Sequence, residues 1–79
     1  GALNTGTSIS TSATQIAVSS DFVYVKNTGS TDVLVTLNNS NYLILLSENE
    51  AFASEISDSA DVRVKTASGT STIEHYKTT

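Results

Sequence analysis

Hydrophobic and polar residues alternate with a period of two along most of the chain, the pattern of half-buried β-strands. Residues 22–27 (FVYVKN) show it clearly: Val23 and Val25 share one face, and Phe22 and Tyr24 share the other. Polar segments rich in Ser, Asn, Asp and Gly separate such runs, as expected for turns. The pattern predicts strands at 14–18, 22–27, 32–38, 42–47, 51–56, 61–66 and 70–77.

These strands predict an all-β fold. About seven short strands at roughly ten-residue spacing indicate a small antiparallel β-sandwich or barrel of a jelly-roll-like kind. Residues 42–47 (YLILLS) are apolar on both faces, so we expect this strand to be covered by the core and by a second surface. Residues 48–56 (ENEAFASEI) also admit one or two helical turns. Gly29 lies in a predicted turn and is free to take a positive φ.

The first thirteen residues (GALNTGTSISTSA) are small and polar, with only Leu3 and Ile9 as apolar anchors. Such a segment buries too little apolar surface to offset the entropy that it loses on ordering. We therefore predict a flexible N-terminal arm over residues 1–13, or an arm that becomes ordered on a neighbouring molecule. A single β-sandwich domain is predicted over residues 14–79.

The composition offers few means of stabilising so short a chain. It has 79 residues, no Cys, no Pro and one His, and Ser and Thr make up 25 of its residues. A domain of this size buries only about 60% of the surface that its unfolded chain exposes, and it usually needs a disulfide, a metal or an oligomer. Disulfides are excluded, and no metal-ligand spacing is present. Self-association, or docking onto a larger partner, is the remaining expectation.

The charge argues against two classes of partner. The net charge is −4 and the pI is about 4.5, and the four basic residues are scattered rather than clustered. Nucleic-acid binding needs a basic footprint, and anionic membranes favour one too. No run approaches the roughly 20 apolar residues of a membrane span. We expect neither nucleic acid nor membrane as a partner.

Candidate catalytic residues are sparse. His75 stands in a predicted strand between Glu74 and Tyr76, which point to the opposite face and cannot orient its ring. Two acidic pairs, at 48 and 50 and at 58 and 61, lie in predicted turns, where acidic residues are expected for solvation. The sequence therefore predicts a non-enzymatic protein with no cofactor and no metal.

The aromatic residues suggest a contact surface. Phe22, Tyr24 and Tyr42 are predicted opposite the Val and Leu stripes, where they either cover a second side, form a subunit interface or offer a platform for a sugar. Tyr and Phe are enriched at protein contacts, and the chain has no Trp to stack on a sugar. An interface or covering role is favoured. The predicted oligomer or capsid interface comprises Phe22, Tyr24, Tyr42, Ile44, Leu46, Leu3 and Ile9.

Four segments carry a family resemblance. Residues 23–29 (VYVKNTG) and 32–37 (DVLVTL) are followed by 42–52 (YLILLSENEAF) and then by 62–74 (VRVKTASGTSTIE). Over residues 22–76 this order resembles the small β-sandwich virion proteins of tailed bacteriophages, of the head-decoration (cement) or tail-accessory type. Asn49 occupies a turn position where such sequences often have Gly, and Asn tolerates the left-handed conformation. Similar strand-and-turn patterns occur in adhesin, pilin and carbohydrate-binding modules.

The resemblance implies a mechanical function. Decoration proteins of this kind form oligomers, most often trimers, on the surface of the phage head and clamp neighbouring major capsid subunits. The arm over residues 1–13 would then grip the lattice. The alternative is a receptor- or glycan-binding module of a phage fibre or adhesin, which predicts exposed Tyr24 or Tyr76 beside acidic and Asn side chains.

Overall fold

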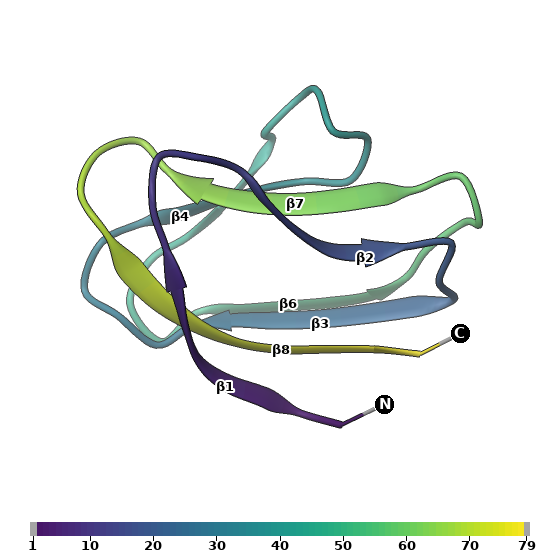
Figure 1. Cartoon of the computed structure of the whole chain (residues 1–79), viewed down its shortest axis with the longest axis horizontal. Coiled ribbons are helices and arrows are strands. Elements are labelled where there is room, and N and C mark those ends of the chain that lie inside the picture. Colours follow the sequence, from purple (N-terminus) through teal and green to yellow (C-terminus); the bar gives the residue numbers. More distant parts are fainter. Residues whose placement is uncertain (1, 79) are drawn as a thin grey trace.

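Eight antiparallel strands form two packed sheets in the computed structural model, which describes residues 2–78 (Figure 1). One sheet (sheet A) has the order β1-β8-β3-β6, and the other (sheet B) has the order β2-β7-β4-β5. No helix occurs among the described residues. The strands are β1 (Asn4–Ile9), β2 (Thr14–Val18), β3 (Phe22–Asn27), β4 (Val33–Thr36), β5 (Ile44–Leu46), β6 (Ala51–Glu55), β7 (Asp61–Thr66) and β8 (Ser71–Thr78).

The strand order is that of one long hairpin rolled into a sandwich. β1 pairs with β8, β2 with β7, β3 with β6 and β4 with β5. Further pairing of β3 with β8 and of β4 with β7 closes the two sheets. An eight-stranded double sheet of this kind is a jelly roll. The predicted all-β, jelly-roll-like sandwich is confirmed, with one strand more than the sequence pattern gave.

The additional strand is β1, which corrects the prediction of a flexible arm for residues 4–9. This segment pairs with β8 from Asn4↔His75 to Ile9↔Ser71, and the Ile9 side chain is fully buried. Backbone hydrogen bonds to β8 and one buried anchor are enough to hold a polar strand at a sheet edge. Residues 1 and 79, which begin the predicted arm and end the predicted domain, lie outside the described residues.

The core lies between the sheets and is built by the predicted alternation. Val23 and Val25 of β3 are fully buried, as are Val62 and Val64 of β7. Side chains of a strand alternate between faces, so each of these pairs packs inward from its own sheet. The other buried hydrophobic residues are Ile9, Ile16, Ala17, Val33, Val35, Leu46 and Ile73.

The segment 42–47 differs from its prediction in phase. Leu46 pairs with Val33 and Ile44 pairs with Val35, so both side chains share the inner face with these buried valines. The strand itself is only three residues long. Its second face is not covered within the chain, because Leu43 is 88% exposed and Leu45 is 53% exposed.

Two turns show why particular residues stand there. Asn49 has φ +67°, so the left-handed conformation expected at this position is present without Gly. Gly29 lacks a positive φ, which corrects the expectation for its turn. Its requirement is steric instead: a Cβ at this position would collide with Ser71 Oγ and lie 2.8 Å from the backbone nitrogen of Thr72.

Asn27, at the end of β3, ties the two sheets together. Its amide nitrogen donates to the carbonyls of Thr31 and of Leu46 in β5, both at 2.8 Å. Its amide oxygen accepts from the Gly29 N–H at 3.0 Å and from Ser71 Oγ at 2.8 Å. The side chain is fully buried and uses its hydrogen-bonding groups in both directions. A buried amide satisfied in this way fixes how the sheets meet.

Candidate functional site

Three aromatic rings form a row on the outer face of sheet A. Tyr24 of β3 stands directly opposite Tyr76 of β8, and Phe22 lies two residues along β3. The Tyr76 ring is the middle one: its centroid lies 5.5 Å from that of Tyr24 and 5.8 Å from that of Phe22, with both pairs tilted by 34°. Each ring is partly buried, because neighbouring rings cover it. We call these three residues the aromatic row.

A carboxylate completes the aromatic row at one end. The Tyr24 hydroxyl donates a hydrogen bond to Glu74 Oε1 at 2.7 Å. This bond raises the pKa of Tyr24 above its ordinary value, and desolvation by burial and the negative charge of Glu74 act in the same direction. Lys26 stands opposite Glu74 in the strand register. The face therefore presents aromatic rings, a neutral phenol and a carboxylate side by side.

The second exposed apolar surface lies at β5, an edge of sheet B. Leu43 and Leu45 are exposed there, and Leu43 lines a shallow pocket of about 240 Å³. The pocket is lined by Val35, Leu37, Asn38, Asn41, Leu43 and Ile44. Nearby, the Lys65 ammonium lies 4.3 Å from the centroid of the Tyr42 ring. We call Leu43 and Leu45 the leucine edge.

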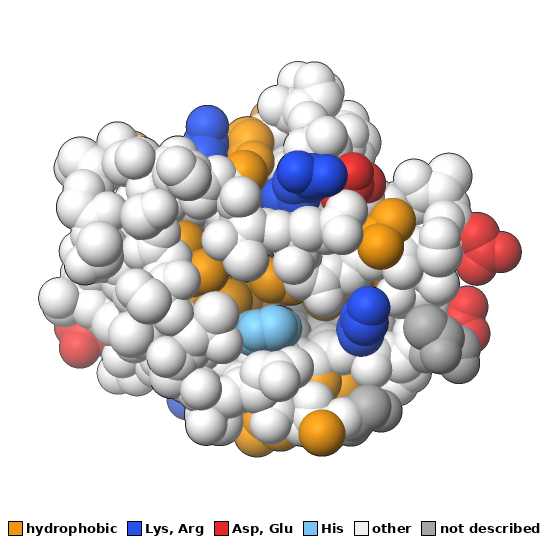
Figure 2. Space-filling view, in the orientation of Figure 1, with side chains coloured by type: hydrophobic (Ala, Val, Ile, Leu, Met, Phe, Trp, Pro, Cys, Tyr) orange, Lys and Arg blue, Asp and Glu red, His pale blue; other side chains and the backbone are white. Residues whose placement is uncertain are grey.

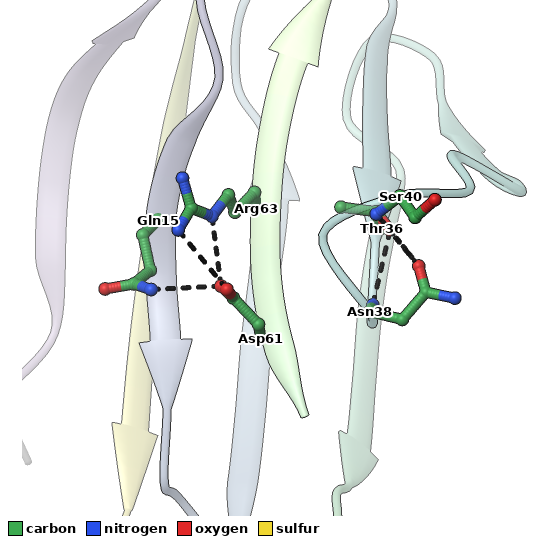
Figure 3. A network of polar contacts seen from close by, with 6 residues as sticks. All are labelled: Gln15, Thr36, Asn38, Ser40, Asp61 and Arg63. Atoms are coloured by element: carbon green, nitrogen blue, oxygen red, sulfur yellow. Dashed lines mark hydrogen bonds and ion pairs between the residues drawn. The ribbon is translucent and has the colours of Figure 1, made fainter. Parts of the chain in front are cut away.

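Polar side chains hold the loop that precedes the leucine edge (Figure 3). Thr36 Oγ1 donates to Asn38 Oδ1 at 2.9 Å, and the Ser40 N–H donates to the same Asn38 oxygen at 3.0 Å. Asn39, between them, has φ +58°. Such side-chain-to-backbone bonds replace the strand ladder in a turn. They fix the path of the chain from β4 towards Leu43.

A second polar group joins β7 to β2. Arg63 Nε lies 3.0 Å from Asp61 Oδ1, and the same oxygen accepts from Gln15 Nε2 at 3.0 Å (Figure 3). The hydrogen bonds from Arg63 and then Gln15 lower the pKa of Asp61, so this carboxylate stays ionised at neutral pH. The arrangement is that of a surface ion pair supporting the sheet, with no nucleophile in it.

His75 lies on the inner side of β8, as its alternation with Glu74 and Tyr76 predicts. The side in view in Figure 2 shows the histidine in a hollow among hydrophobic side chains. Its Nε2 lies 3.3 Å from Thr7 Oγ1 in β1, and partial burial lowers its pKa. Within residues 2–78, no group of three His, Cys, Asp or Glu side chains is placed to hold a metal ion. The described part of the chain also has no helix that could span a lipid bilayer.

The structure separates the residues predicted for an interface. Phe22 and Tyr24 lie together on the outer face of sheet A, and Tyr42 lies on the opposite sheet beside Lys65. Leu3 precedes β1 and is 52% exposed. Three further residues belong to the interior rather than to an outer face: Ile9 and Leu46 are buried in the core, and Ile44 packs against it.

Sequence reasoning missed Leu43 and Leu45, because a strand that is apolar on both faces gives no phase. The pairing of Leu46 with Val33 and of Ile44 with Val35 is what assigns the faces. Sequence reasoning also omitted Tyr76 from the predicted interface, although the alternation from Ile73 to Tyr76 places Tyr76 on the outer face.

Comparison with known proteins adds no relative: no protein-family model, no curated protein and no solved structure matches this chain.

Proposed function

We propose that this chain is a non-enzymatic structural protein of a phage virion, a decoration (cement) protein that binds the head surface and stabilises it. The leucine edge carries the proposal. Leu43, at 88% exposure, stands beside Leu45 and an apolar pocket, and burial of such side chains on a partner removes apolar surface from water. The partner in this proposal is the major capsid protein or another virion protein.

The fold and the sequence resemblance support the same direction. Jelly rolls are used by viral capsid domains and by lectins, although a fold by itself does not define a function. A small rigid sandwich that binds only the assembled shell stabilises that shell by mass action. The trimeric state and the position on the phage head rest on the resemblance over residues 22–76.

The test is cosedimentation with expanded, undecorated heads of a tailed phage from the source of the chain. Wild-type protein is expected to sediment with the heads and to raise their melting temperature. Leu43→Asp is expected to weaken binding by about tenfold or more, because it places a charge in the buried contact. Val18→Asp, at a residue 39% exposed on β2, is the matched control and is expected to bind as wild type. Equal binding of both variants, or none by wild type, would refute the proposal.

A second candidate function, binding of a glycan receptor, is favoured by the aromatic row. Tyr76 lies between two rings and Tyr24 is hydrogen-bonded to Glu74, so stacking surfaces and a hydrogen-bond acceptor are adjacent. A glycan array probed with wild type and with Tyr76→Ala tests it. Binding lost in Tyr76→Ala but kept in Tyr42→Ala, an aromatic residue on the other sheet, supports the candidate; an array without signal refutes it.

A further inference from the structure

Three of the four sheet edges carry a feature that hinders pairing with another strand. The ladder of β1 is interrupted between Asn4 and Thr7, and that of β2 between Gln15 and Ala17. β5 is only three residues long. Bulges and short strands are means by which proteins keep sheet edges from adding a foreign strand.

The fourth edge, β6, has none of these features. All five residues pair with β3 in unbroken register, from Phe22↔Glu55 to Lys26↔Ala51. The strand (AFASE) contains no Lys and no Pro, and its one charge stands at the last position. Ala51 and Ala53 are small and exposed, so no side chain shields the edge.

Hydrogen bonds beside this ladder show which backbone groups are free. Asn27 N–H donates to Glu50 O and Ile56 N–H donates to Asp21 O, each at 2.9 Å. Backbone groups of an antiparallel strand alternate between its two sides. The N–H and C=O groups of residues 51, 53 and 55 therefore point away from β3. The Glu55 carbonyl also accepts from Ser54 Oγ at 2.8 Å, which leaves it one lone pair.

We propose that β6 pairs with β6 of a second copy of this chain, antiparallel and about a two-fold axis at Ala53. Ala53 then stands opposite Ala53, and Ala51 stands opposite Glu55 of the other copy. About six backbone hydrogen bonds form, and the two A sheets become one continuous sheet of eight strands. The inference does not rest on the proposed function, because the pairing uses neither the leucine edge nor a shell, and it departs from the trimer that the resemblance implies.

Charge complementarity favours a second copy as the occupant, with Lys26 lying between Glu74 of its own chain and Glu55 of the other copy. Lys26 pairs with Ala51 in the register, and the two-fold axis places Glu55 of the other copy on the far side of the same alanine. The two charged residues stand on one face, about 10 Å apart in backbone and separated only by a methyl group. Lys and Glu side chains span that distance and form two symmetric ion pairs.

The outer face of sheet A agrees with this choice. Ala53 stands opposite Tyr24, so the small Ala53 pair places the two aromatic rows on one continuous surface of the joined sheets.

The first test changes the backbone of the edge. In Ala53→Pro the lost N–H is one that does not bond to β3, so the single chain is expected to keep its fold. Sedimentation equilibrium from about 1 μM to about 1 mM should show wild type moving from 8.3 kDa towards twice that mass. Ala53→Pro should weaken dimerisation by about tenfold or more, since two central hydrogen bonds are lost. Ala53→Ser, which keeps the N–H, should dimerise as wild type.

The second test reverses the charges and decides the question if Ala53→Pro fails to fold. Lys26→Glu and Glu55→Lys alone each place like charges across the axis and should weaken the dimer by about threefold to tenfold. The double variant restores opposite charges and should return to within about threefold of wild type. Three outcomes would overturn the pairing: a chain that stays monomeric, a trimer, or a dimer whose mass is unchanged by both sets of substitutions. None of these results bears on the leucine edge, so the proposed function is judged separately by its cosedimentation test.

Discussion

The outer faces of the two sheets use apolar residues in opposite ways. On sheet A, the rings of Phe22 and Tyr24 both contact that of Tyr76, and the Tyr24 hydroxyl is hydrogen-bonded to Glu74. On sheet B, Leu43 and Leu45 project from the short strand β5 into solvent. The first face covers its apolar surface with its own side chains, whereas the second leaves it exposed to solvent.

The difference follows from strand length. β3 and β8 run side by side over six register pairs, so residues two positions apart on one strand meet the same ring on the next. β5 pairs with β4 over three positions only, and Leu43 stands before the first of them. A side chain without a neighbouring strand has no partner for its outer surface, whatever its type.

The largest expected effect is at Asn27, whose buried side chain is hydrogen-bonded within both sheets. Asn27→Ala removes four hydrogen bonds of a buried amide, to the Leu46 and Thr31 carbonyls, the Gly29 N–H and the Ser71 hydroxyl. We expect a loss of about 3 kcal/mol or more in the free energy of unfolding, measured by urea denaturation. Asn41→Ala, in an exposed loop, should change it by less than about 0.5 kcal/mol. A loss below about 1 kcal/mol at Asn27 would mean that the sheets are held mainly by apolar packing.

The next test divides the two faces directly. Tyr76→Ala removes the middle ring of the aromatic row. It should lower the free energy of unfolding by about 2 kcal/mol, because burial and two ring contacts are lost. Tyr42→Ala, on sheet B, removes a ring whose described partner is the Lys65 ammonium and should cost less than about 1 kcal/mol. If urea denaturation gave equal losses of unfolding free energy for the two variants, the proposed difference between the faces would be wrong.

A smaller effect is expected from the hydroxyl of the aromatic row. Because the folded state raises the pKa of Tyr24, its contribution to stability is complete below the unfolded pKa near 10 and is lost as pH rises through the higher folded value. Tyr24→Phe should lose about 1 kcal/mol or less at neutral pH. Urea midpoints measured from pH 8 to pH 11 should fall less steeply for Tyr24→Phe than for wild type. Parallel slopes would show that the Glu74 bond contributes nothing.

The smallest effect is expected at the leucine edge. Leu43→Ser in dilute protein should change the free energy of unfolding by less than about 0.5 kcal/mol, because an 88% exposed side chain buries almost nothing on folding. The same variant should bind phage heads less well than wild type. A stability loss above about 1 kcal/mol in the monomer would show that Leu43 serves the fold and would remove the contrast with sheet A.

Much of the fold could be predicted because alternation is a local signal. The shared face of Val23 and Val25 was assigned from period two alone, and a turn at Asn49 followed from the tolerance of Asn for positive φ. β1 could not be found in this way, since its polar residues are held by the backbone of β8, which is 71 residues away in sequence at the Asn4–His75 pair. Pairing of that kind leaves no trace in the local pattern.

The candidate sites were predicted less well, for a related reason. Phe22 and Tyr24 were placed on an outer face correctly, because polar or buried neighbours set their phase. Ile44 and Leu46 were placed on the wrong face, because every residue from 42 to 46 is apolar and only the register with β4 decides. Gly29 was interpreted through its φ, whereas its role depends on the close approach of Ser71 and Thr72.

The pairing of the first strand with the last has a mechanical consequence. β1 and β8 run antiparallel, with Asn4 beside His75 and the two ends of the chain at the same end of the sheet (Figure 1). Tension applied between residues 4 and 78 would therefore peel β1 from β8 one hydrogen bond at a time, which needs little force, instead of shearing the whole ladder at once. We expect single-molecule pulling through these positions to open the sandwich at low force. The protein would therefore resist a force better when the force is applied at the side of a sheet than when it is applied at residues 4 and 78.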